Sequence, residues 1–189
     1  MEKLIGLKKV KTAVFISGTG SNLKNLISFS KIKISPISID LIISNTYKAK
    51  GLRYADQFKI KKKIFDSKNN EKNILLLLKK EKIKLICLAG FMKILSKNFI
   101  KKFDGKIINI HPSLLPKYKG LNTHSRAINS KDKFTGCTVH FVTARLDSGK
   151  IILKKIIKIL AKDTATTLAK KVLIEEHKLY PAAIMKIFN

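Results

Sequence analysis

The feature that most constrains the fold is a regular alternation of short apolar runs with segments of helical periodicity, which fills the first 110 residues. The apolar runs predict strands at 12–17, 37–43, 63–65, 85–89 and 106–110, and the segments between them predict helices around 23–27, 48–58 and 70–82. Strands that alternate with helices form βαβ units, in which the strands are parallel. The sequence therefore predicts an α/β fold with a doubly wound, mostly parallel sheet and helices on both faces.

The C-terminal part of the chain departs from this alternation. It predicts a helix at 123–130, two strands at 136–143 and 150–158 with a turn at 146–149, and a long helix at 164–187 with a kink or break at Tyr180–Pro181. We expect these last strands to be antiparallel. No internal repeat, linker or low-complexity block appears, so we predict a single domain over residues 1–189.

The chain is strongly basic, with 40 Lys and Arg against 12 Asp and Glu and a net charge of +28. One interpretation of this charge is a nucleic-acid-binding protein. The other is compositional drift, because Lys, Ile and Asn are used heavily throughout and the lysines form no stripe with interleaved aromatic residues. We favour drift and expect no nucleic-acid partner, although a basic surface attracts small anionic substrates.

The sequence predicts no membrane segment and no export signal. No apolar run reaches the roughly 18 residues of a transmembrane helix, and residues 1–6 lack the apolar core of a signal peptide. Cys87 and Cys137 lie inside apolar, strand-like segments, which favours reduced core cysteines over a disulfide. We therefore expect a cytoplasmic protein with no membrane partner.

A glycine-containing turn, Gly18-Thr19-Gly20-Ser21-Asn22, separates the first predicted strand from the helix that follows. Free N–H groups and the positive dipole end at a helix N-terminus can bind a phosphate. The turn lacks the third glycine of a dinucleotide fingerprint and the Gly-Lys-Ser/Thr of a Walker A loop. By itself it is equally consistent with an ordinary turn in which Ser21 caps the helix.

The segment 109–116 places two chemically useful side chains at the end of a predicted strand. Because side chains alternate in an extended backbone, Asn109 and His111 point to the same side. Pro112 restricts His111 to extended conformations, and Pro116 closes the segment as a rigid loop. Ligands bind at the carboxyl ends of strands in open α/β sheets, so we favour a functional His111 over a structural one.

Asp147 lies in a predicted turn, where Asp is common for local reasons. If the fold brings it to His111, its carboxylate favours the imidazolium and raises the histidine pKa. His124, His140 and His177 are weaker candidates, and none has metal-ligand spacing with Cys or acidic residues. We expect no metal cofactor and find no nucleophile elbow or Cys–His pair.

Together, these motifs resemble the phosphoribosylglycinamide formyltransferase family of folate-dependent enzymes in purine synthesis. The resemblance rests on segments that occur in the family's order and span nearly the whole chain, at 16–23, 88–96, 109–120, 139–143, 146–149, 175–177 and 180–181. The glycine turn alone is a weak signal, whereas the joint set is highly specific. Three positions depart from the family pattern: Asn122 replaces a common histidine, and Lys119 and Lys150 replace common prolines.

The resemblance implies substrate and cosubstrate contacts. Gly20, Ser21 and Asn22 would bind the phosphate of glycinamide ribonucleotide, and Glu176 would contact the same substrate at its sugar hydroxyls or amine end. The positions that would contact the folate are Lys68, Met92, Lys93, Ile94, Leu95 and Asn109.

The resemblance also implies a reaction, in which the formyl group of 10-formyltetrahydrofolate passes to the amine of 5-phosphoribosylglycinamide on the route to IMP. Asn109 would donate to the formyl oxygen, His111 would transfer protons, and Asp147 would raise the pKa of His111 and orient a water. Direct attack needs no metal and no covalent enzyme intermediate. We expect a monomer or a weak homodimer.

Other acceptors and classes remain as alternatives. A methionyl-tRNA formyltransferase shares the Asn, His and Asp residues, and the charge of +28 would suit tRNA, but we expect no tRNA-contacting domain after residue 189. A formyltetrahydrofolate hydrolase would carry an additional N-terminal domain, which we also do not expect. A basic α/β protein without catalysis would bind nucleic acid in a steeply salt-dependent way. A decayed enzyme would have lost part of the Asn, His and Asp trio, which is intact here.

Overall fold

The structure is a computed structural model that describes residues 8–65 and 71–188. The chain divides into two compact units, each of which has its own strands and helices. Of the described residues, 8–65, 71–92, 103–106 and 188 belong to the first unit, and 93–102 and 107–187 belong to the second.

The first unit contains four parallel strands. They are β1 (Val10–Ile16), β2 (Ile37–Ser44), β3 (Lys61–Ile64) and β4 (Leu85–Leu88), in the spatial order β3-β2-β1-β4. The buried centre of β1, residues 13–16, has no exposed surface. A continuous apolar run of this kind is expected for a parallel strand that is covered on both faces.

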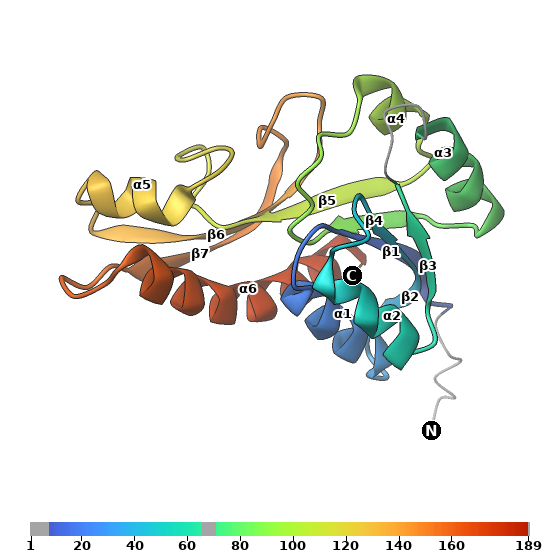
Figure 1. Cartoon of the computed structure of the whole chain (residues 1–189), viewed down its shortest axis with the longest axis horizontal. Coiled ribbons are helices and arrows are strands. Elements are labelled where there is room, and N and C mark those ends of the chain that lie inside the picture. The colour runs from blue at the N-terminus through green and yellow to red at the C-terminus, as the bar shows by residue number, and fades with distance from the viewer. Residues whose placement is uncertain (1–7, 66–70, 189) are drawn as a thin grey trace. The chain divides into compact units, whose positions relative to one another are not determined.

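Helices connect these parallel strands, and right-handed connections determine the face of the strands on which each helix lies. They are α1 (Ser21–Lys31), the short 3-10 helix η1 (Lys50–Leu52) with α2 (Arg53–Gln57), and α3 (Glu71–Lys80). The strand order runs one way from β1 to β3 and then returns to β4, so the first two connections and the third belong on opposite faces. Figure 1 shows α1 and α2 on one side of the strands and α3 on the other.

The second unit contains the antiparallel strands. Apart from the end residues Lys106 and Phe188, it holds β5 (Lys106–His111), β6 (Phe134–Phe141), β7 (Ile151–Lys158), α4 (Lys97–Lys102), α5 (Thr123–Asn129) and α6 (Ala165–Phe188). β6 pairs antiparallel with both β5 and β7. Tyr180 of α6 is fully buried, and its hydroxyl donates a hydrogen bond to the Ile108 carbonyl oxygen at 3.2 Å.

The predicted fold class is confirmed, with parallel strands in the first part of the chain and antiparallel strands near its C-terminal end. Ser96 caps the start of α4, because the Phe99 N–H donates to Ser96 Oγ at 3.0 Å. The third strand begins at Lys61 instead of 63, since exposed lysines gave no apolar signal there.

Of the kink or break predicted at Tyr180–Pro181, the break is wrong, because α6 continues through Pro181 to Phe188. Proline removes one helical hydrogen bond and disfavours a helix interior. Here Tyr180 is anchored before the proline, and Ala183 and Ile184 are fully buried after it. Packing of the last turns therefore outweighs the local preference.

Cys87 and Cys137 are free and buried, as predicted. Burial raises the pKa of the Cys137 thiol to about 12, so this side chain behaves as a small core residue. Among the described residues, no helix is long and apolar enough to cross a membrane. The single domain over 1–189 stays a prediction.

Candidate active site

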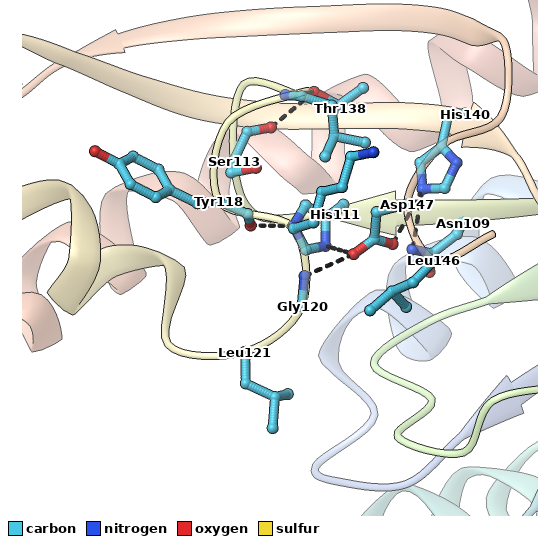
Figure 2. Close-up of polar contacts among 12 residues, drawn as sticks. Asn109, His111, Ser113, Tyr118, Gly120, Leu121, Thr138, His140, Leu146 and Asp147 are labelled. Carbon is cyan, nitrogen blue, oxygen red and sulfur yellow. Dashed lines mark hydrogen bonds and ion pairs between the residues drawn. The ribbon is translucent and has the colours of Figure 1, made fainter.

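Two facing strands carry three polar side chains of the second unit. β5 ends at His111 and pairs with β6 in a register that sets Asn109 opposite His140 and His111 opposite Thr138. Residues two apart on a strand share a face, and directly paired residues on neighbouring strands do so as well. Figure 2 shows Asn109, His111 and His140 gathered around Asp147.

Asp147 reaches this group from the segment between β6 and β7. Its backbone is left-handed, with φ of 45°, and its side chain is 7% exposed. One carboxylate oxygen, Oδ2, lies 3.4 Å from His111 Nδ1 and accepts the Gly120 N–H at 2.9 Å. The other, Oδ1, lies 3.6 Å from His140 Nε2. The structure thus brings together the three residues that the sequence singled out for catalysis.

The hydrogen bonds of His111 identify the nitrogen that can exchange a proton. Nε2 lies 2.8 Å from the carbonyl oxygen of Tyr118, and because a carbonyl only accepts, Nε2 carries the hydrogen. Nδ1 therefore faces Asp147. In the neutral ring Nδ1 has no hydrogen to donate to the carboxylate, and the 3.4 Å between Nδ1 and Oδ2 is longer than the roughly 2.7–2.9 Å of a charge-assisted hydrogen bond. The lone pair of Nδ1 is therefore left to accept a proton.

Burial dominates the pKa of His111. It lowers that pKa below the ordinary histidine value, while the hydrogen bond to Tyr118 and the charge of Asp147 act in the opposite direction. The sequence predicted only the upward effect of Asp147, and the net shift is downward because most of the ring is removed from water. His111 is accordingly a neutral base at neutral pH.

Asp147 remains a carboxylate in this environment. Burial raises its pKa, but contact with His140, the Gly120 N–H and the two imidazoles together hold the pKa below the usual value. The negative charge of Asp147 beside His111 Nδ1 stabilises the imidazolium that forms when Nδ1 accepts a proton.

A loop from 112 to 122 holds the carbonyl oxygen that orients His111. Thr138 Oγ1 donates to the Ser113 carbonyl at 2.7 Å, and Ser113 Oγ donates to the Lys117 carbonyl at 2.6 Å. Tyr118 is left-handed, with φ of 54°, and its hydroxyl donates to Asp132 at 2.8 Å. Both ends of Tyr118 are therefore fixed.

Two of the three positions that depart from the family pattern, Lys119 and Asn122, lie in this loop. Asn122 precedes α5 with φ of 58°, a conformation that Asn adopts more readily than most residues. Lys119 Nζ donates to Ser148 Oγ at 2.5 Å, which joins this loop to the segment that carries Asp147. Lys150 is exposed and its carbonyl accepts the Phe141 N–H at 2.9 Å.

The glycine turn lies in the first unit, at the start of α1. Gly20 is the residue before the helix, with φ of 78°, and a Cβ there would lie 2.6 Å from Gly51 Cα. Only glycine fits this position. No side chain caps α1, so the alternative in which Ser21 caps the helix is wrong, and Asn22 is buried at 7% exposure.

The remaining predicted contacts are distributed over both units. Met92 and Ile94 are 67% and 70% exposed, whereas Leu95 is buried. The Met92 N–H donates to Ser17 Oγ at 2.8 Å. Lys93 is half-buried, Glu176 is buried on α6, and Lys68 lies outside the described residues.

Sequence reasoning gave too little weight to His140 and missed the backbone groups of Tyr118 and Gly120. The signal for His140 was its alternation within a predicted strand, but only the register of β5 with β6 sets it opposite Asn109. Over residues 8–65 and 71–188, no group of three or more His, Cys, Asp or Glu is arranged to hold a metal ion.

Known proteins with similar sequences share one family. Residues 10–184 match the family model described as formyl transferase. The chain is 41% identical over 180 residues to phosphoribosylglycinamide formyltransferase of Haemophilus influenzae, an alignment that covers 92% of this chain and 85% of that protein. It is 42% identical over 186 residues to the human trifunctional purine biosynthetic protein adenosine-3, of which the match spans only 18%.

Solved structures agree with this similarity. The crystal structure of phosphoribosylglycinamide formyltransferase from Brucella melitensis superposes with a TM-score of 0.89 at 42% identity, covering 95% of this chain and 96% of that one. The enzyme of the same name from Anaplasma phagocytophilum gives a TM-score of 0.90 at 40% identity and covers 94% and 86%.

Proposed function

Since this chain belongs to the formyl transferase family, we propose that it transfers the formyl group of 10-formyltetrahydrofolate to the amine of 5-phosphoribosylglycinamide. The family expected from the sequence is confirmed, and the donor, the acceptor and the residue roles are our proposal. The observation that carries it is the cluster of Asn109, His111 and Asp147, which combines a hydrogen-bond donor, a base and an anion within one unit.

Asn109 stabilises the charge that develops in the transition state. The substrate amine attacks the formyl carbon, and the formyl oxygen becomes negative. A fixed N–H donor at such an oxygen typically contributes about 3–4 kcal/mol to the activation free energy. The Asn109 amide supplies this N–H.

His111 and Asp147 move the proton that the reaction releases. The amine loses one proton as its C–N bond forms, and N10 of the folate gains one as its bond to the formyl carbon breaks. Nδ1 of His111 accepts the first and returns it to N10. Asp147 stabilises the imidazolium between these steps, a general acid–base contribution of about 10²–10⁴-fold.

Substrate binding in this proposal follows the family resemblance. The phosphate binds at Gly20, Ser21 and Asn22. This assignment is supported by their position at the start of α1, where backbone N–H groups are free to bind an anion. Glu176 contacts the ribonucleotide. Met92 and Ile94 offer exposed apolar surface to the pterin, and Lys93, Leu95 and Lys68 are retained as folate contacts from the sequence alone.

The protein's wider setting is also proposed. The free, buried cysteines support a cytoplasmic location. We propose that the enzyme acts on small molecules without nucleic acid or membrane, as a monomer or weak homodimer. Because a net charge of +28 would also suit a polyanionic acceptor, methionyl-tRNA is the competing acceptor.

The acceptor can be tested by following loss of the formyl group from 10-formyltetrahydrofolate. We expect loss only when the ribonucleotide is present. Loss without any acceptor would indicate a hydrolase, and loss that requires methionyl-tRNA would replace the proposed acceptor. A folded protein inactive with every acceptor would contradict formyl transfer altogether.

A further inference from the structure

We propose that His140 is a positioning residue that fixes the orientation of the Asn109 side-chain amide, so that an N–H of Asn109 points to the formyl oxygen. This inference rests on the proposed function, in which Asn109 is the donor to that oxygen. It follows from the hydrogen-bond partners of the His140 ring, which Figure 2 shows beside Asn109 and Asp147.

The backbone determines which His140 nitrogen carries the hydrogen. Nδ1 lies 2.8 Å from the carbonyl oxygen of Phe141, and a carbonyl only accepts, so Nδ1 is the donor. The side chain is 3% exposed, so water does not compete freely for the ring. In a ring that carries one proton, Nε2 then has a lone pair and must accept.

The group that Nε2 meets is the amide nitrogen of Asn109, at 3.3 Å. An N–H of that amide donates to Nε2, which leaves the second N–H for another acceptor. If the amide were flipped, its oxygen would face the lone pair of Nε2, and two acceptors would be opposed. In the described part of the chain no other side-chain hydrogen bond involves the Asn109 amide, so His140 alone selects its orientation.

The amide orientation decides whether Asn109 can help the reaction. With its nitrogen held by His140, the amide has an N–H available for the oxygen that becomes negative. A freely flipping amide would spend part of its time presenting an oxygen, which repels that charge. Because Asn109 and His140 are paired directly across β5 and β6, the sheet itself sets their separation.

Asp147 offers the competing arrangement. Its Oδ1 lies 3.6 Å from Nε2, with His111 on the other oxygen. A doubly protonated His140 would donate to Asp147, which is the contact that helps to hold the pKa of that carboxyl low, and could no longer accept from Asn109. The proposal therefore requires the singly protonated, Nδ1–H form of His140 in the working enzyme.

Nitrogen NMR of the wild-type enzyme tests that form directly and does not depend on activity. With 15N-labelled histidine at pH 7.5, we expect His140 to show a protonated Nδ1 and an unprotonated Nε2. A spectrum with a proton on Nε2, in either the other tautomer or the imidazolium, would overturn the proposal.

Single-turnover kinetics test the consequence. His140→Asn keeps a donor for the Phe141 carbonyl but removes the acceptor at Nε2, whereas His140→Gln can place its amide oxygen there. We expect His140→Asn to lower the rate by about 10–100-fold, short of the full loss of an oxyanion donor, with substrate dissociation constants within about twofold of wild type. His140→Gln should regain most of the rate.

A double-mutant cycle with Asn109→Ala separates a positioning role from a merely structural one. If His140 acts through Asn109, His140→Asn has no further effect on the rate once the amide is gone. Additive losses would overturn the inference. If wild-type enzyme does not formylate the ribonucleotide, the proposed function fails first; if it does and only the His140 results disagree, this inference fails alone.

Discussion

The polar cluster has a strand side and a loop side, and the two are built differently. Asn109, His111 and His140 lie on β5 and β6, where the ladder sets their direction. The groups that come from loops, Tyr118, Gly120 and Asp147, all have left-handed backbones, with φ of 54°, 76° and 45°. The strand side holds its groups without strain, whereas Tyr118 and Asp147 each adopt a conformation that costs a non-glycine residue about 1–2 kcal/mol.

The strand side and the loop side supply different functions. The strands supply the donor, Asn109, and the base, His111. Their relative positions are fixed because both lie on β5, which is paired with β6 in one register. The loops supply an anion and a carbonyl that set the protonation and tautomer of His111. Substitutions on the loop side can therefore alter proton transfer while leaving the strand geometry intact.

The largest effect on the loop side is expected from Asp147→Asn. Asn tolerates a positive φ and keeps the side-chain shape, so only the charge is lost. Without it the imidazolium of His111 is not stabilised, and we expect the single-turnover rate to fall by about 10²–10⁴-fold. A rate within about threefold of wild type, in a protein with unchanged melting temperature, would exclude Asp147 from proton transfer.

The pH dependence of the free energy of unfolding tests the burial of the His111 ring on the strand side. The folded pKa of His111 lies below its ordinary value, so the unfolded state binds more protons as pH falls below about 6.5. Its contribution to stability is therefore present above that pH and is lost on acidification. Burial lowers the pKa of His124 and His177 in the same direction.

We expect the free energy of unfolding in urea to decrease from pH 7.5 to pH 5.5, and His111→Gln to reduce that decrease, since glutamine does not titrate. An equal decrease in wild type and variant would show that the His111 ring is not held in its neutral form by burial.

Gly120→Ala measures the strain on the loop side. A Cβ at Gly120 meets only Leu146 at 3.7 Å, an ordinary contact, so the penalty comes from the positive φ. We expect a loss of about 1–2 kcal/mol in the free energy of unfolding. Lys131→Ala is a matched comparison, because that exposed residue also has a positive φ, of 51°, and already carries a Cβ. A stability change at Gly120 no larger than at Lys131 would contradict the strain.

The smallest effect is expected from Tyr118→Phe, which removes the hydroxyl that donates to Asp132 and leaves the carbonyl that accepts from His111. Stability should fall by about 1 kcal/mol, the usual value of one hydrogen bond. The rate should fall only a few-fold, about tenfold at most, because the backbone contact survives. A loss as large as that of Asp147→Asn would mean that the hydroxyl itself takes part in the chemistry.

The same contrast explains how much the sequence could predict. Period-two alternation and the proline after His111 were enough to set Asn109 and His111 on one face of a strand end. Asp147 was suspected from the family resemblance, but no local pattern could bring it to His111, since that contact depends on the path of a loop. The cross-strand pairing of Asn109 with His140 required a register that the apolar pattern of β6 did not specify.

Burial is the second reason why the sequence could not predict the whole site. The sequence predicted that the charge of Asp147 would raise the pKa of His111, and only the packed structure shows that removal of the ring from water dominates. The continuity of α6 through Pro181 has a similar origin, because packing around Tyr180 and Ile184 overrides a local signal.

The most direct test of the account is the single-turnover rate of formyl transfer to the ribonucleotide in His111→Ala, compared with His177→Ala. His177 is a half-buried histidine on α6, so it controls for the loss of an imidazole elsewhere in the fold. We predict a fall of about 10²–10⁴-fold for His111→Ala and a near wild-type rate for His177→Ala. Equal rates in the two folded variants would contradict the assignment of the chemistry to the end of β5.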